Sequence, residues 1–169
     1  GDLDAYLLTN RVNMSKDSVM ANLIKDERGN LKVKEKYKEL GYFLDRPGNI
    51  PVLINAGQYD YLYKNENGYF VDVTVESGIG KNPHYGLSAT WWDYNDDGRP
   101  DLYVANDFMG PDHLFQNLGL DSNGVIKFKD VVSEAIPYTP WFSMGADYSD
   151  INNDGKMDLM ASDMAGSNH

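Results

Sequence analysis

Short apolar segments alternate with polar, glycine-rich turns along most of this chain. Residues 89–92 (Ala-Thr-Trp-Trp) lead into an acidic stretch, and residues 102–105 (Leu-Tyr-Val-Ala) follow it. Residues 159–161 (Leu-Met-Ala) follow a second acidic stretch. Aromatic and β-branched residues in runs of this length favour β-strands, and the Gly and Asn residues between the runs favour turns. The pattern predicts an all-β protein of antiparallel strands.

Two acidic decapeptides, residues 93–102 and 150–159, both read D-x-N-x-D-G-x-x-D-L. Oxygen-bearing side chains recur at positions 1, 3, 5 and 9, and a glycine at position 6 permits the positive φ that reverses the chain. A hard cation with many oxygen ligands suits this pattern. We therefore predict a calcium ion in each loop. Magnesium, which keeps more of its waters, is the second choice, and zinc is disfavoured because neither loop contains Cys or His.

The predicted calcium ligands occupy the same motif positions in both loops, with a backbone carbonyl at position 7. In the first loop they are Asp93, Asn95, Asp97, the carbonyl of Arg99, and Asp101. In the second loop they are Asp150, Asn152, Asp154, the carbonyl of Lys156, and Asp158. An EF-hand would need a glutamate at position 12 and flanking helices, and this chain has Val104 or Ala161 there with strand-like flanks. The alternative is an ordinary Asp-Gly hairpin turn with solvated acids.

The two loops belong to a longer repeat. Gly98 and Gly155 are 57 residues apart, and related segments precede both loops. Residues 1–8 match the end of the motif, with Asp4 at position 9. Short strands repeated at this period indicate β-propeller blades. Since the chain starts inside one motif and two to three blades cannot close a ring, we expect a fragment of a larger propeller.

The loops resemble those of FG-GAP/VCBS repeats, the calcium-binding blades also found in integrin α-chain propellers. Residues 101–108 and 143–150 look most like bacterial relatives of the cartilage acidic protein family. The resemblance implies a β-propeller with calcium at the loop positions given above. It does not specify a biological role, because such repeats serve adhesion, surface display and ligand binding alike.

The repeats divide the chain into the tail of a preceding blade, a polar insertion and two blades. These segments are residues 1–10, 11–50, 51–110 with calcium loop 93–101, and 111–169 with calcium loop 150–158. In the insertion we expect one short helix opening at Ser15 and another over residues 31–41, although the Lys/Glu mixture of the second also suits a solvated loop. Insertions on repeat scaffolds often carry binding specificity, and a tolerated surface loop is the alternative.

Charge and cysteine content narrow the function. The 26 acidic and 15 basic residues give a net charge of −11, which argues against binding to nucleic acid or an anionic membrane. The chain has no cysteine, so calcium would take the stabilising role of disulfides. Extracellular calcium modules bind at about 0.1–1 mM. We therefore expect an extracellular, cell-surface or periplasmic protein without direct membrane insertion.

Other chemistry-bearing residues give weaker signals. The three histidines are scattered along the chain, at His84, His113 and His169, and predict no zinc site. The three tryptophans are Trp91, Trp92 and Trp141. They are expected to pack between blades or pin a strand, with stacking on a sugar as the alternative.

Three functions compete. The first is a non-enzymatic, calcium-binding module that recognises an extracellular protein or carbohydrate. The second is a polysaccharide lyase or hydrolase on a propeller scaffold, for which His84 and Tyr85 form the only neighbouring pair to nominate. The third is a surface or filament subunit whose open sheet edges pair with further copies or other chains.

Overall fold

A computed structural model describes residues 3–10, 23–36, 41–46, 50–55, 58–80, 84–107 and 110–164. Antiparallel strands form almost all the regular structure of these residues, so the predicted all-β class is confirmed. In chain order the elements are β1 (Ala5–Leu7), β2 (Leu23–Lys25), β3 (Leu31–Val33), β4 (Gly41–Arg46), β5 (Ile50–Asn55), β6 (Tyr61–Glu66), β7 (Tyr69–Asp72), α1 (Thr74–Ser77), β8 (Tyr85–Trp92), β9 (Asp101–Asp107), β10 (His113–Leu120), β11 (Ile126–Asp130), α2 (Val132–Ala135), β12 (Ser143–Ser149) and β13 (Asp158–Asp163). Among the described residues, neither helix has the length or apolar character that crossing a bilayer requires.

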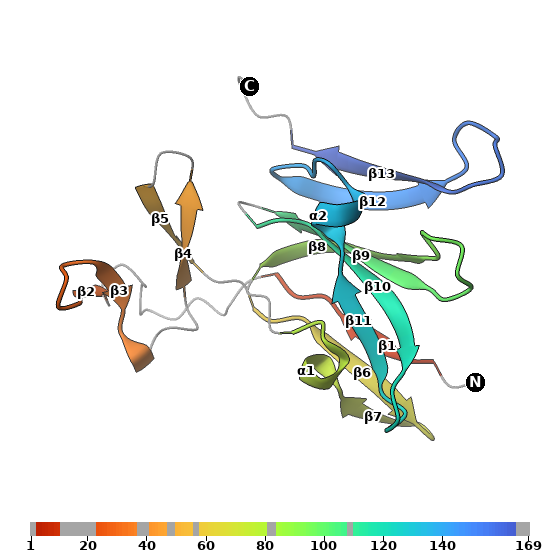
Figure 1. Cartoon of the computed structure of the whole chain (residues 1–169), viewed down its shortest axis with the longest axis horizontal. Coiled ribbons are helices and arrows are strands. Elements are labelled where there is room, and N and C mark those ends of the chain that lie inside the picture. Colours follow the sequence, from red (N-terminus) through yellow and green to blue (C-terminus); the bar gives the residue numbers. More distant parts are fainter. Residues whose placement is uncertain are drawn as a thin grey trace.

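Three sheets are stacked in the main body of the protein (Figure 1). The first has the strand order β1-β6-β7, the second β11-β10-β9-β8, and the third is the pair β12-β13. The sheets divide the chain differently from the sequence repeat, because segment 51–110 contributes β6 and β7 to the first sheet but β8 and β9 to the second. The strands expected on either side of each acidic loop are confirmed as β8, β9 and β13.

Strand β9 is buried on both faces, which explains its continuous apolar sequence. Leu102 and Val104 belong to a cluster shared with the first sheet through Leu62. Tyr103 and Ala105 belong to a second cluster, against which side chains of β12 and β13 pack. Because successive side chains of a strand point to opposite faces, one short strand joins both hydrophobic cores.

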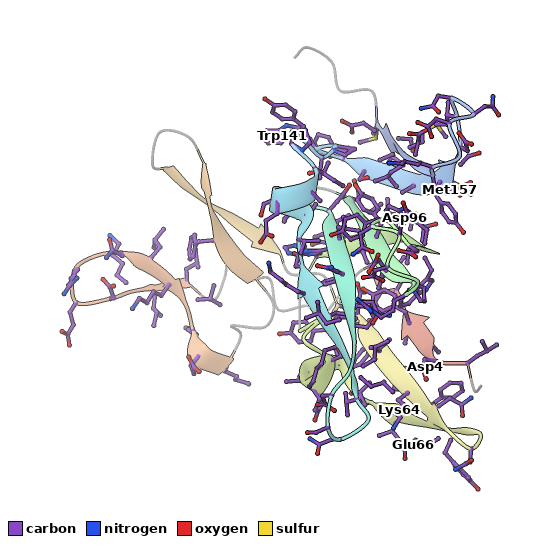
Figure 2. All side chains as sticks on the ribbon, turned by 45° about the vertical axis from the view of Figure 1, so that its right-hand side comes forward. Asp4, Lys64, Glu66, Asp96, Trp141 and Met157 are labelled. Atoms are coloured by element: carbon purple, nitrogen blue, oxygen red, sulfur yellow. The ribbon has the colours of Figure 1, made fainter. Side chains whose placement is uncertain are left out.

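The two adjacent tryptophans of β8 follow the same alternation. Trp91 makes aromatic contacts with Tyr6 of β1 and Phe128 of β11. Trp92 is buried and stacks on Tyr148 of β12, with ring centroids 5.9 Å apart. Trp92 therefore packs between sheets, as the sequence predicted, whereas Trp91 contacts the first sheet through Tyr6 but remains 37% exposed. Trp141, in contrast, is exposed at the far end of the third sheet (Figure 2).

The repeat is also visible in a buried tyrosine–aspartate pair. Asp60 accepts hydrogen bonds from the Tyr6 hydroxyl at 2.7 Å and the Thr9 backbone N–H at 2.7 Å. Asp112 in the same way accepts a hydrogen bond from the Tyr103 hydroxyl at 2.5 Å. It also accepts one from the backbone N–H of Asn106, three residues after Tyr103. Burial raises the pKa of both carboxyl groups above the ordinary value. Each pair ties the end of one strand to the start of the next in its sheet.

Two hairpins, β2–β3 and β4–β5, lie between β1 and β6 along the chain and beside the stacked sheets in space (Figure 1). The helix expected over residues 31–41 is wrong, because Leu31–Val33 is a strand paired with β2. The Asp26 carboxylate accepts the backbone N–H groups of Arg28 and Asn30, and Gly29 has a φ of 82°. This tight turn favours a hairpin over the helix that the Lys/Glu composition allowed. The helix expected at Ser15 lies outside the described residues.

Candidate metal centre

The acidic loops connect β8 to β9 and β12 to β13, and both lie at the end of the sheets away from the β2–β3 and β4–β5 hairpins (Figure 1). Figure 2 shows Asp96 in the first loop and Met157 in the second. The structure therefore places the two loops on equivalent connections, each between a pair of antiparallel strands.

The aspartate at position 1 organises each loop by accepting two backbone N–H groups. The two oxygens of Asp93 accept from Asp97 at 3.0 Å and from Gly98 at 2.6 Å. The two oxygens of Asp150 accept from the corresponding residues, Asp154 and Gly155, at 3.0 and 2.9 Å. The two loops thus have the same hydrogen-bonded core.

Positions 3 and 5 repeat as well. In the first loop, the Asn95 amide oxygen accepts the Asp97 N–H at 3.2 Å, and Asp97 accepts the Arg99 N–H at 3.0 Å. The second loop contains the same two bonds, at 2.9 Å each, among Asn152, Asp154 and Lys156. In each loop, side-chain oxygens of positions 1 and 3 both accept from the backbone N–H of position 5, so these two oxygens lie close together.

The backbone of each loop contains two residues with positive φ. Gly98 has a φ of 82° and Gly155 has 85°, as predicted for motif position 6. Position 4 also has positive φ, 58° at Asp96 and 60° at Asn153, which the sequence analysis did not foresee. Asp and Asn tolerate this conformation better than most other residues, which explains their presence at position 4.

Position 9 is a buried anchor. Asp101 is fully buried and accepts the N–H groups of Asn117 at 2.6 Å and Tyr94 at 3.1 Å. Burial raises the pKa of Asp101 above the ordinary value, and the nearby charges of Asp97 and Asp93 add to this effect. Asp101 therefore joins its loop to strand β10 through its own two oxygens.

The same anchor occurs in the other repeats. Asp4 accepts the N–H of Asn65 on β6 at 2.9 Å, beside the strand it holds (Figure 2). Asp158 accepts the N–H of Ile151 at 3.1 Å. Asp4, which the sequence aligned with motif position 9, thus makes the same contact as Asp101. The donors Asn65 and Asn117 occupy equivalent places on β6 and β10.

The loops differ in their local positive charge. The Arg99 guanidinium bonds to Asp97 at 2.6 Å and to the Asn117 carbonyl at 2.8 Å. Lys156, at the same position in the second loop, makes no side-chain ion pair among the described residues. Part of the negative charge of the first loop is therefore already balanced, whereas that of the second faces solvent.

The donor set fits a hard cation, because the side chains at positions 1, 3, 5 and 9 are all oxygen donors on one tight loop. Within the described parts of the chain, however, no three or more His, Cys, Asp or Glu side chains lie close enough together to share an ion. The loop carboxylates accept backbone N–H groups instead. The ten predicted ligands consequently remain a prediction.

Sequence reasoning missed a cluster at the opposite end of the sheets. His84 and His113 are 29 positions apart in the chain, yet their ring centroids lie 5.1 Å apart. His113 also pairs with Asp130 at 2.7 Å. Their separation along the chain hid this proximity. β8 and β10 run in the same direction on either side of β9, and His84 precedes β8 while His113 begins β10.

Comparison with known proteins gives relatives for this chain. Cartilage acidic protein 1 of Homo sapiens is 25% identical over 157 residues, covering 82% of this chain and 22% of that protein. The Mus musculus protein of the same name is 27% identical over 112 residues, covering 66% of this chain and 17% of the relative. The Xenopus tropicalis protein is 26% identical over 117 residues, with the same coverage. The chain thus spans 17–22% of the length of the curated relatives it matches.

A family match covers a defined part of the chain. Residues 93–161 match the FG-GAP-like repeat family, and they include both acidic loops and the strands and turns between them. This is the segment in which the loop hydrogen bonds recur. Residues 93–161 are thus similar to FG-GAP-like repeats, in a chain that is similar to cartilage acidic protein 1.

Proposed function

We propose that this chain is part of a calcium-binding, non-enzymatic β-propeller that recognises a protein or glycan outside the cell. The observation that carries the calcium assignment is the identical hydrogen-bonded arrangement of oxygen side chains in two loops 57 residues apart. Asp93, Asn95, Asp97 and Asp101 would hold one ion, and Asp150, Asn152, Asp154 and Asp158 would hold the other. Calcium supplies positive charge that relieves repulsion among these carboxylates.

We infer an extracellular location, where the calcium concentration suits such sites. Sites of this kind in extracellular modules bind calcium at about 0.1–1 mM, far above the free calcium of the cytosol. The relatives are cartilage acidic proteins, and this chain is itself strongly acidic. A bound ion in each loop would fix the connection between paired strands, and it would hold the stacked sheets in register.

Calcium is expected to stabilise the folded chain by binding to the loop aspartates. If the two sites bind at about 0.1–1 mM, 10 mM calcium adds about 1.4–2.7 kcal/mol per site to the free energy of unfolding. Asp97→Ala and Asp154→Ala should each remove the calcium-dependent stabilisation that one site contributes. The loss should be larger for Asp154→Ala, because Arg99 already balances part of the charge of Asp97. Urea unfolding in calcium and in a chelator measures both effects.

Asp96→Asn is the matched control for this experiment. It removes a charge from the same loop at a position not predicted to bind the ion, and the second loop naturally carries Asn153 there. Asp96→Asn should keep the full calcium response. A chain whose unfolding is the same in calcium and in chelator would refute the calcium assignment.

We infer that recognition involves the β2–β3 and β4–β5 hairpins. They lie away from the acidic loops (Figure 1), and the ends of the segment that carries them meet where the Thr9 hydroxyl bonds to the Gln58 carbonyl at 2.7 Å. This closure lets a short Gly-Ser linker replace residues 11–57. The full chain is expected to bind members of an array of glycans and extracellular-matrix proteins in calcium, and the shortened chain to lose that binding. Equal binding by both chains would contradict a role for the hairpins.

A further inference from the structure

Two imidazoles meet at the end of the sheets opposite the acidic loops. His84 immediately precedes β8 and His113 begins β10, and their rings are tilted by 39° with centroids 5.1 Å apart. Two imidazoles bound to one tetrahedral ion at about 2.1 Å have ring centres roughly 5 Å apart. The observed separation therefore suits a shared metal ion.

His113 has the surroundings of a metal ligand. Its Nδ1 lies 2.7 Å from the Asp130 carboxylate, and its Nε2 is buried without a hydrogen-bond partner. His113 is 8% exposed, and its ring stacks on Phe115. When Nδ1 of the neutral imidazole donates to Asp130, the lone pair of His113 lies on Nε2, the nitrogen that has no described partner.

A carboxylate on one ring nitrogen and a metal on the other is the usual environment of a ligating histidine. A buried polar nitrogen left without any partner destabilises the folded state. The orphaned Nε2 of His113 is therefore a feature that a bound ion would explain, and that packing alone does not.

His84 is partly buried beside the His113 ring. Its Nδ1 lies against Gly110, where an added Cβ would come within 2.6 Å of that nitrogen. Gly110 also lines a surface pocket together with Pro111, Thr139, Pro140 and Trp141.

We propose that His84 and His113 form a two-imidazole site for a first-row transition metal ion of the zinc, nickel or copper class. Imidazole nitrogen favours these ions over calcium, so the site is chemically separate from the oxygen-lined loops. Because no group of three or more His, Cys, Asp or Glu side chains is assembled among the described residues, water or a bound ligand completes the coordination. Asp130 is the positioning residue that orients the His113 ring.

The direct test is X-ray absorption at the zinc edge, using the unmodified chain with one equivalent of zinc and excess calcium. Two imidazole scatterers at about 2.0–2.1 Å are expected. A shell of oxygen alone would overturn the proposal, since it would place zinc in the acidic loops, which contain no histidine. This measurement needs no variant, so it does not depend on how well a substituted chain folds.

Zinc titration of variants provides the second test, with calcium present throughout. His84→Gln and His113→Gln should each reduce zinc affinity at least 10-fold. Asp130→Asn should weaken it about 10-fold or more and keep the two-imidazole spectrum. His169→Gln, which changes the third histidine, is the control and should bind like the parent chain. Unchanged affinity in His84→Gln, or an equal loss in His169→Gln, would overturn the assignment.

Discussion

Replacing Phe128 with alanine is expected to lower the free energy of unfolding by about 3–5 kcal/mol. Phe128 lies on β11, is 5% exposed and belongs to the core between the first and second sheets. Its ring contacts Trp91, and its carbonyl lies where the chain turns at Gly78 after α1. Truncation would leave a cavity at the junction of the two sheets, which the surrounding backbone cannot close. Urea unfolding in calcium measures the loss.

The repeat supplies a matched control in Phe70. Phe70 pairs with Asn65 on β6 as Phe128 pairs with Asn117 on β10, so the two residues occupy equivalent strand positions. Phe70 is 58% exposed, because no neighbouring sheet covers β7 among the described residues. Phe70→Ala should therefore change stability by less than about 1 kcal/mol. Similar losses for the two variants would contradict the described burial, and would indicate that β7 is covered in solution.

Asp101→Ala is expected to lower the free energy of unfolding by about 3 kcal/mol even in chelator, because it leaves one buried and one partly buried N–H group without an acceptor. Those groups belong to Asn117 and Tyr94, so β10 and the first loop lose a common anchor. This effect is structural and adds to any loss of calcium binding. Unfolding measurements in chelator isolate it.

Asp158→Ala is the corresponding change in the second loop. Asp158 is partly exposed and makes one described backbone bond, to Ile151, so its removal in chelator should cost about 1 kcal/mol or less. In calcium both variants should lose the response of their own loop. An Asp101→Ala variant no less stable in chelator than Asp158→Ala would show that position 9 acts through the ion alone.

The acidic loops could be predicted from sequence because their structure is local. Asp93 and Asp150 bond to N–H groups four and five residues further on, and glycine at position 6 permits the turn. The flanking strands followed from their apolar composition. The hairpin at β2–β3 was missed because a single turn, centred on Asp26 and Gly29, decided between helix and strand.

The second role of position 9 was hidden for a different reason. The motif identified Asp101 as a metal ligand, but its bond to Asn117 joins residues 16 positions apart on neighbouring strands. The repeated tyrosine–aspartate pairs could have been found from the sequence, since Asp60 and Asp112 precede matching apolar segments. Their hydrogen bonds, however, depend on strand pairing that the sequence alone does not specify.

By itself the sequence determined the all-β class, the two oxygen-rich loops and the strands on either side of them. These features depend on composition, on glycine conformation and on contacts within about ten residues. The tertiary structure alone decided that β9 is buried on both faces, that Phe128 is covered while Phe70 is exposed, and that His84 meets His113. Each of these depends on which strands lie next to one another, because packing joins side chains whose separation in the chain carries no local signal.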